Sequence, residues 1–88
     1  MLCIAPLTNI ALALCLDSSL PSKIKEIFIM GGTLHGKGNF KKNVEFNFGI
    51  DPHAAKIVFD SFSLIHLIPW ESSHEFKVSN EEMELLFD

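Results

Sequence analysis

Three short apolar runs, separated by longer segments with other patterns, constrain most strongly how this 88-residue chain can fold. The runs lie at residues 2–5, 27–30 and 63–68, and a proline follows the first and the third. Their length is typical of buried strands, and the β-branched and aromatic residues of the second run also favour a strand. Because helical patterns lie between them, the runs predict parallel strands of an open α/β sheet with helices on its faces.

Caps and apolar spacing predict three helices around these strands. The helix over residues 10–16 is apolar on nearly every side, so it needs neighbours on more than one side. A second helix is predicted to begin at Pro52, and a third occupies the last residues of the chain. The expected N-terminal caps are Thr8 or Asn9 for the first helix, Asp51 for the second, and Ser79 paired with Glu82 for the third.

The number of predicted strands is small for a sheet of this kind. Parallel sheets are normally buried on both faces and contain more strands. A chain of 88 residues also buries only a modest core. We therefore expect residues 1–88 to form one partial domain, the middle of a larger α/β domain whose other elements cover the first helix and the sheet.

Composition and charge exclude several classes of protein. Hydrophobic residues make up 48% of the chain, which excludes a disordered protein, and a net charge of −4 without a dense basic patch argues against nucleic acid as a partner. No run of about 20 apolar residues is present to span a membrane. Cys3 and Cys15 lie in apolar runs, which indicates buried, reduced thiols of a cytoplasmic protein, with a single disulfide as the alternative.

Residues 31–50 contain all five glycines and have neither helical nor alternating spacing. A loop of this length in a compact domain is most often functional. Its start, GGTLHGKG, nearly matches a phosphate-binding loop through Gly31, Gly36 and Lys37, but glycine replaces the hydroxyl residue at position 38. No helical pattern follows Lys37, so binding of a nucleoside triphosphate is the less favoured hypothesis.

Asn39, Glu45 and Asn47 give the same loop two amides and a carboxylate. The loop follows a predicted strand, and ligands of open α/β sheets bind at the carboxyl ends of strands. These groups together donate and accept several hydrogen bonds, which suits a neutral ligand with many hydroxyls, such as a sugar. The alternative is that the three side chains satisfy backbone groups of the loop, and the sequence leaves both interpretations open.

Four separate motifs point to one family of proteins. APLTNIALAL, IMGGTLHGKGN, VEFNFGIDPHAAKIVF and LIPWE occur in this order, and over residues 2–72 the chain resembles the inosine-uridine preferring nucleoside hydrolases. The PWE of the last motif resembles the animal-type branch of that family. The resemblance implies a Rossmann-like fold and hydrolysis of the N-glycosidic bond of purine or pyrimidine ribonucleosides to a free base and ribose.

The resemblance also implies roles for individual residues. Asn39, Glu45 and Asn47 match family residues that bind the ribose hydroxyls. Met30 matches a methionine that lies close to the sugar. Thr8 matches a threonine whose backbone carbonyl binds the Ca²⁺ of the family enzymes.

Other functional groups of the family have no match in this chain. The family's catalytic base and most of its Ca²⁺ carboxylates belong to an aspartate cluster that would precede Met1, and its acid belongs to a His-Asp pair without a counterpart after Glu71. We therefore expect no catalytic base or acid among the 88 residues, doubtful Ca²⁺ binding, and a fragment that is inactive alone. The alternative is a non-catalytic module that forms homo-oligomers or pairs with a full-length subunit through its uncovered apolar surface.

Overall fold

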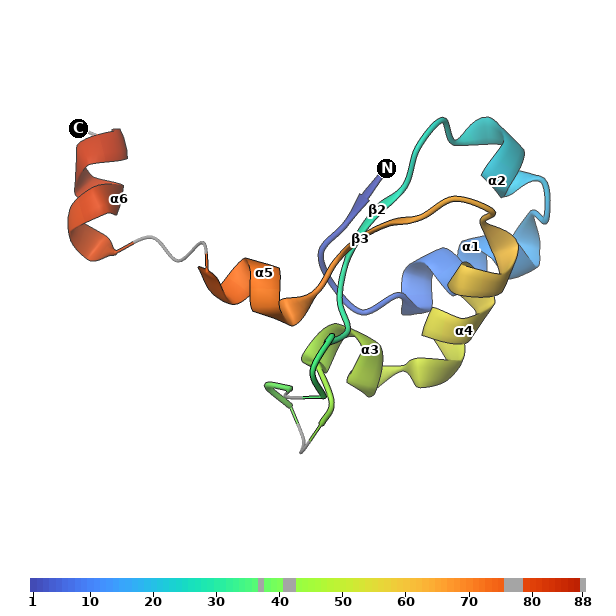
Figure 1. Ribbon diagram of the computed structural model, residues 1–88. Helices are drawn as coiled ribbons and strands as arrows, with labels where there is room; N and C mark the ends of the chain where they lie inside the picture. Colours follow the sequence, from blue (N-terminus) through green and yellow to red (C-terminus); the bar gives the residue numbers. More distant parts are fainter. Residues whose placement is uncertain (37, 41–42, 76–78, 88) are drawn as a thin grey trace.

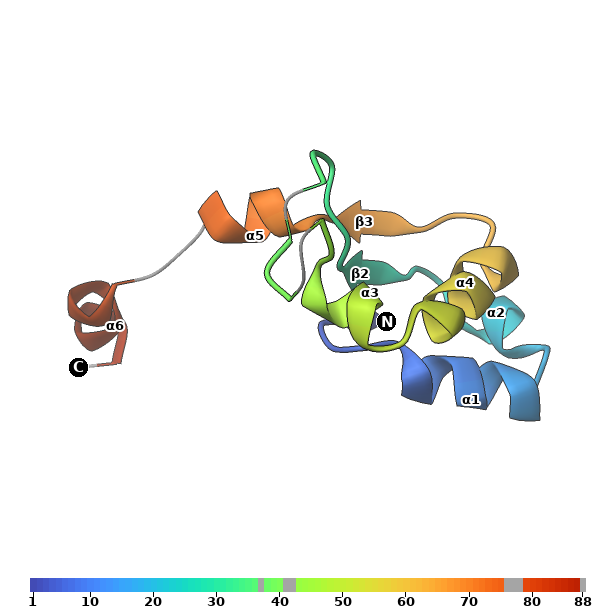
Figure 2. The ribbon, with the colours of Figure 1, turned by 90° about the horizontal axis from the view of Figure 1, so that it is seen from below.

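The computed structural model describes residues 1–36, 38–40, 43–75 and 79–87, whose elements are arranged as in Figure 1. Lys37, Lys41 and Lys42 lie outside the described residues. Figures 1 and 2 both place the last helix apart from the other elements. In chain order the elements are β1 (Leu2–Cys3), α1 (Thr8–Leu16), α2 (Leu20–Lys23), β2 (Phe28–Met30), α3 (Phe46–Ile50), α4 (Pro52–Ser61), β3 (His66–Ile68), α5 (Trp70–Glu75) and α6 (Asn80–Phe87).

The three strands form one parallel sheet in the order β1-β2-β3. Leu2 lies opposite Phe28, and Phe28 lies opposite His66 on the other side of β2. The predicted open parallel α/β sheet is therefore confirmed. Each strand is shorter than the apolar run that predicted it, because only the start of the first run and the ends of the other two pair with a neighbour.

Helices α1 and α4 pack against each other and cover one face of the sheet. Ile29 in β2 and Val58 in α4 are completely buried at the centre of this packing. Burying a side chain of this size contributes about 1.5–3 kcal/mol, so apolar contacts are the main source of stability here. The core consists of Cys3, Leu7, Ala11, Leu14, Ile27, Ile29, Ala54, Ala55, Val58 and Phe62.

The opposite face of the sheet is much more open. Leu2 on this face is 66% exposed, and Ile68 is also exposed. The ring of Phe28 stacks on the imidazole of His66, with 4.4 Å between ring centroids. In the described part of the chain α1 and α4 cover one face only, which agrees with the expectation of a partial domain whose sheet lacks some of its covering elements.

The helix caps confirm two of the three predictions. The Asp51 carboxylate accepts a hydrogen bond from the Ala54 amide at 3.0 Å and caps α4 as expected. Ser79 and Glu82 exchange the two hydrogen bonds of a capping box before α6. Thr8 or Asn9 as the cap of α1 is wrong: Leu7 occupies the cap position without a side-chain hydrogen bond, and Thr8 is already helical.

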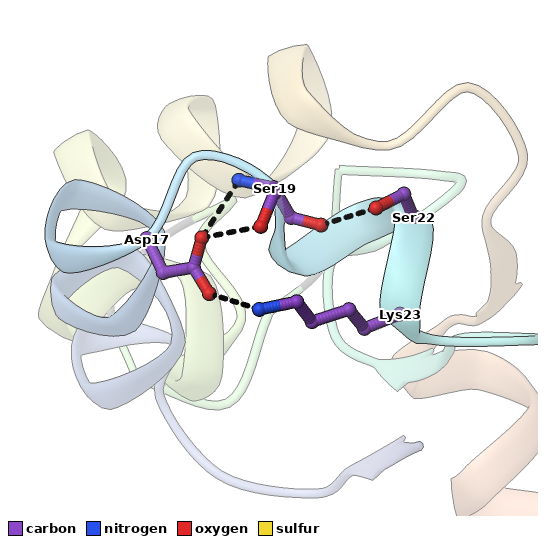
Figure 3. A network of polar contacts seen from close by, with 4 residues as sticks. All are labelled: Asp17, Ser19, Ser22 and Lys23. Atoms are coloured by element: carbon purple, nitrogen blue, oxygen red, sulfur yellow. Dashed lines mark hydrogen bonds and ion pairs between the residues drawn. The ribbon is translucent and has the colours of Figure 1, made fainter.

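The connection between α1 and β2 contains the short helix α2, and Asp17 holds it in place (Figure 3). The Asp17 carboxylate accepts hydrogen bonds from the Ser19 amide at 3.0 Å and from the Lys23 ammonium group at 2.7 Å. The Ser22 hydroxyl donates to the Ser19 carbonyl at 2.6 Å. The bonds from Lys23 and Ser19 lower the pKa of Asp17, and the network fixes the connection from α1 towards β2.

The two cysteines differ in their surroundings. Both thiols are free, but Cys3 is buried in the core whereas Cys15 is exposed. The prediction of two buried cysteines is therefore wrong for Cys15, because this residue lies on the outer side of α1. Within the described ranges, no helix combines the length and the apolar content required to cross a membrane.

Candidate functional site

The glycine-rich segment begins at the carboxyl end of β2 and returns to it through α3. The prediction that residues 31–50 lack helical structure is wrong at Phe46–Ile50, which form α3. This helix has no apolar period of its own, and it forms because Glu45 caps its first turn. Residues 38–40, which directly follow Lys37, are not helical, so the structural context of a phosphate-binding loop is missing among them.

Asn47 in α3 lies directly against the end of β2. Its Nδ2 group donates to the Met30 carbonyl oxygen at 3.0 Å and contacts the Met30 sulfur at 3.3 Å. Asn47 is also one of only two buried polar side chains in the described part of the chain. The structure thus brings together two of the predicted site residues, which are 17 positions apart in the sequence.

Glu45 is the other buried polar residue and is only 3% exposed. Its Oε1 accepts hydrogen bonds from the Gly32 amide at 2.9 Å and the Phe48 amide at 3.1 Å. Its Oε2 accepts from the Asn47 amide at 2.7 Å. The carboxylate therefore caps α3 and connects the start of the glycine-rich segment to its end. The sequence left open whether Glu45 accepts hydrogen bonds from loop backbone groups, and the structure shows that it does.

Asn39 joins this group through the first residue of α3. Its Oδ1 accepts a hydrogen bond from the Phe46 amide at 2.8 Å, and the residue is exposed. Among the described residues, none pairs with the Asn39 Nδ2 group or with the Asn47 Oδ1 atom. One amide donor and one amide acceptor therefore remain available to a ligand beside the Glu45 carboxylate.

Thr8 lies at the start of α1, after the carboxyl end of the neighbouring strand β1. Its hydroxyl donates to Asp51 Oδ2 at 2.7 Å, which ties the amino end of α1 to that of α4. This bond, followed by the bond from the Ala54 amide, lowers the pKa of Asp51. The hydrogen-bond network of Met30, Asn39, Glu45 and Asn47 does not include Thr8 among the described residues.

The residues near Thr8 do not fit a Ca²⁺ site by themselves. Ca²⁺ takes about 6–8 oxygen ligands, mostly carboxylates and carbonyls. Both oxygens of Asp51 already accept hydrogen bonds, from Thr8 and Ala54. No group of three or more His, Cys, Asp or Glu side chains that could hold a metal ion exists within the described ranges.

Glu71, which sequence reasoning did not single out, contacts the other side of the glycine-rich segment. Its carboxylate accepts from the Leu34 amide at 2.7 Å, the His35 amide at 3.2 Å and the Thr33 hydroxyl at 3.2 Å. Partial desolvation raises the pKa of Glu71, but the hydrogen bonds from Leu34, Thr33 and His35 outweigh it and leave the pKa lowered. An acidic residue three positions after the end of a parallel strand was the available sequence signal.

A cavity of about 410 Å³ adjoins this site on the side of α4. Of the four residues predicted to bind the substrate, only Glu45 lines it. Its walls are mainly apolar, so it does not match the polar groups of Asn39 and Asn47. The lining residues are Gly32, Thr33, Asn43, Val44, Glu45, Phe48, Gly49 and Pro52.

An open parallel sheet with polar side chains on a glycine-rich loop at its carboxyl edge is typical of α/β domains that bind ligands at this edge. The sequence match is more specific. Residues 1–87 match the family model described as inosine-uridine preferring nucleoside hydrolase. The chain therefore belongs to this family, as the four sequence motifs predicted.

Individual relatives agree with the family assignment. The pyrimidine-specific ribonucleoside hydrolase RihA of Shewanella oneidensis is 43% identical over 79 residues, which are 90% of this chain and 24% of that protein. Uridine nucleosidase 1 of Arabidopsis thaliana is 39% identical over 83 residues, which are 94% of this chain and 25% of that protein. The chain thus spans about a quarter of the length of these relatives.

A solved structure supports the same fold. The inosine-uridine preferring nucleoside hydrolase from Bacillus anthracis superposes with a TM-score of 0.84 and 31% sequence identity. The match covers 96% of this chain and 30% of that structure. The Rossmann-like nucleoside hydrolase fold expected from the sequence is therefore confirmed.

Proposed function

We propose that this chain is the central, ribose-binding part of a ribonucleoside hydrolase, which cleaves the N-glycosidic bond of purine or pyrimidine nucleosides to a base and ribose. The observation that carries the proposal is the hydrogen-bonded group at the carboxyl edge of the sheet. The Asn47 side chain donates a hydrogen bond to the Met30 carbonyl, and the Glu45 carboxylate accepts one from the Asn47 backbone amide. The Asn39 side chain accepts one from the Phe46 backbone amide.

The chemistry of these groups suits a ribose. The Asn39 Nδ2 group can donate to a hydroxyl, and the Asn47 Oδ1 atom can accept from one. Cleavage of the N-glycosidic bond develops positive charge on the sugar, and a buried carboxylate such as that of Glu45 is suited to stabilise this charge. Met30 contributes an apolar contact beside Asn47.

The 88 residues alone are proposed to bind weakly and not to turn over. A general acid or base contributes about 10²- to 10⁴-fold each, and no residue of this chain matches the family's base or acid. Calcium is part of the proposed function only for a complete family enzyme, because the described residues around Thr8 do not provide enough oxygen ligands. A cytoplasmic location and the animal-type branch stay predictions.

Titration of the ¹⁵N-labelled chain with uridine and with inosine tests the binding. We expect the side-chain amide signals of Asn39 and Asn47 to move, and Asn39→Ala to weaken the response about fivefold through the loss of one hydrogen bond. Asn80→Ala, an amide removed from the distant helix α6, is the matched control and leaves the response unchanged. If both nucleosides leave the two amide signals in place at millimolar concentration, the ribose-binding proposal fails.

A separate assay addresses turnover. Release of free base from uridine and inosine, with and without added Ca²⁺, is expected to stay at the level of the blank. Turnover at the rate of a complete enzyme would show that the chain contains a base and an acid that the motifs did not reveal.

The exposed apolar side chains favour a second candidate, a non-catalytic module that pairs with a full-length subunit. Leu16 in α1 is 90% exposed, and Leu12 on the same helix is 58% exposed. Apolar side chains gathered on one element mark contact surfaces. Gel filtration discriminates between the candidates: a monomer at all concentrations, which does not co-elute with a full-length subunit, rules out the pairing module.

A further inference from the structure

The contacts of Glu71 are unusual because a single side chain holds three consecutive residues of a segment more than 30 positions away. Its Oε2 accepts from the Leu34 amide at 2.7 Å, the His35 amide at 3.2 Å and the Thr33 hydroxyl at 3.2 Å. Its Oε1 also accepts from the Leu34 amide, at 3.2 Å. Hydrogen bonds to an ionised carboxylate are roughly twice as strong as those between neutral groups.

Backbone contacts join the same two segments just before these bonds. The Gly31 amide donates to the Ile68 carbonyl at 3.0 Å, and the Trp70 amide donates to the Gly32 carbonyl at 2.9 Å. The Gly32 amide in turn donates to Glu45 on the other side. The start of the glycine-rich segment is therefore held between two carboxylates, Glu45 from its own end and Glu71 from the junction of β3 and α5.

Apolar packing contributes little at this point of the chain. Leu34 is 70% exposed, and His35 is exposed as well. Gly36, the next residue, has a φ of +72°, and no neighbouring atom lies closer than 3.9 Å to the place where a Cβ would stand. Only three residues separate His35 from Asn39, so the position of His35 limits where Asn39 can lie.

We propose that Glu71 is a positioning residue of the candidate site, an inference that rests on the proposed ribose-binding function. It fixes residues 33–35 and thereby places Asn39 beside Glu45 and Asn47, without contacting the sugar itself. Residues 31–32 are held by backbone bonds and by Glu45, so removal of Glu71 leaves the fold intact and releases the segment from Thr33 onwards.

The variants Glu71→Gln and Glu71→Ala test the position of the segment. In the ¹⁵N-labelled 88-residue chain, the amide signals of Leu34 and His35 are expected to move and their hydrogen exchange to become about tenfold faster in Glu71→Ala. The side-chain amide of Asn39 and the amide of Phe46 are expected to move with them. Glu71→Gln keeps one acceptor oxygen at the same reach, so it should give a smaller change in the same signals.

Asp17→Asn is the matched control. Asp17 is another carboxylate that accepts a backbone amide and a side-chain donor, but it lies in the turn that connects α1 and α2 (Figure 3). The control is expected to leave the signals of Leu34, His35 and Asn39 in place. The signals of Ile29 and Val58 monitor the core, and they should be unchanged in all three variants.

The outcomes separate a positioning role from a local one. Displacement of the Asn39 side-chain signal in Glu71→Ala, with the core signals of Ile29 and Val58 unchanged and a several-fold weaker uridine response, supports the proposal. Movement of Leu34 and His35 alone, with Asn39 and its uridine response unchanged, overturns it, as does a chain in which no signal moves. If the Asn39 signal moves but the unmodified chain shows no uridine response, the positioning of the segment stands and the proposed function fails.

Discussion

Two regions of this molecule are stabilised in different ways. Around α1, α4 and β2, fully buried side chains such as Ile29 and Val58 interlock, and hydrogen bonds serve mainly the helices and the sheet. At the start of the glycine-rich segment, the amides of Gly32 and Leu34 are held by two carboxylates, Glu45 and Glu71, and the Leu34 side chain is 70% exposed. The difference shows how a small domain keeps a polar ligand-binding surface in place: side chains from outside the surface satisfy the backbone of the segment that carries it.

Phe48 connects the two regions. Its ring lies edge to face with that of Phe59 in α4, at 5.5 Å between centroids, and it is packed against the core. It also lies close to the backbone of Gly31 and Gly32, where a side chain would collide with its ring. Loss of core packing should therefore affect the polar segment, whereas loss of a contact within the segment should affect the core much less.

The largest effect is expected from a core substitution. Ile29→Ala removes a fully buried side chain between the sheet and the two helices, and should lower the free energy of unfolding by about 2–5 kcal/mol. Urea denaturation followed by circular dichroism measures the change. Ile29→Val, which removes only one methylene group, is the control, with an expected loss of about 0.5–1.5 kcal/mol. A loss below about 0.5 kcal/mol for Ile29→Ala would mean that the apolar cluster is not the source of stability.

The fold could be predicted from the sequence because its signals are local. A run such as residues 27–30 indicates a strand by composition alone, and Asp51 followed by Pro52 indicates a helix start without knowledge of any distant residue. The cap of α1 was mispredicted for a tertiary reason: the Thr8 hydroxyl bonds to Asp51, 43 positions away, instead of to its own helix. Tertiary contacts of this kind override local preference.

The candidate site was only partly predictable. Asn39, Glu45 and Asn47 could be singled out by residue type and by their place after a strand, and the structure connects all three. The sequence left open whether the Glu45 carboxylate satisfies backbone groups, and it did not indicate the contact of Glu71 with residues 33–35. Both depend on how a long glycine-rich segment folds back on itself, and glycine leaves that course undetermined by local preference.

An intermediate effect is expected from two glycines in the polar segment, and the pair sharpens the comparison. Gly32 and Gly36 have φ values of +73° and +72°, so alanine at either position adopts a conformation that costs about 1–2 kcal/mol. At Gly32 a new Cβ would also lie 2.9 Å from the Phe48 ring, whereas at Gly36 the nearest atom is 3.9 Å away. Gly32→Ala should therefore lower the unfolding free energy more than Gly36→Ala, and the difference measures how strongly Phe48 couples the segment to the core.

Urea denaturation of the two alanine variants provides the measurement. Gly36→Ala is the control for the backbone conformation alone, because nothing crowds the added methyl group. Equal losses in the two variants would show that the Phe48 ring moves aside freely. In that case the two regions are less tightly coupled than the packing of Phe48 indicates.

The smallest effect is expected from pH, and it acts on the polar segment. The pKa of Glu71 in the folded chain is lowered from its ordinary value of 4.5, so its contribution to stability is fully present above that value. As the pH falls from 4.5 through the folded pKa, the unfolded chain binds the proton first and the contribution is lost. The difference in unfolding free energy between the natural chain and Glu71→Gln should therefore be constant above pH 4.5 and shrink below it. If the difference in unfolding free energy between the two chains stays constant below pH 4.5, the three donors around Glu71 do not favour its ionised form. The segment is then held by Glu45 and by backbone hydrogen bonds alone.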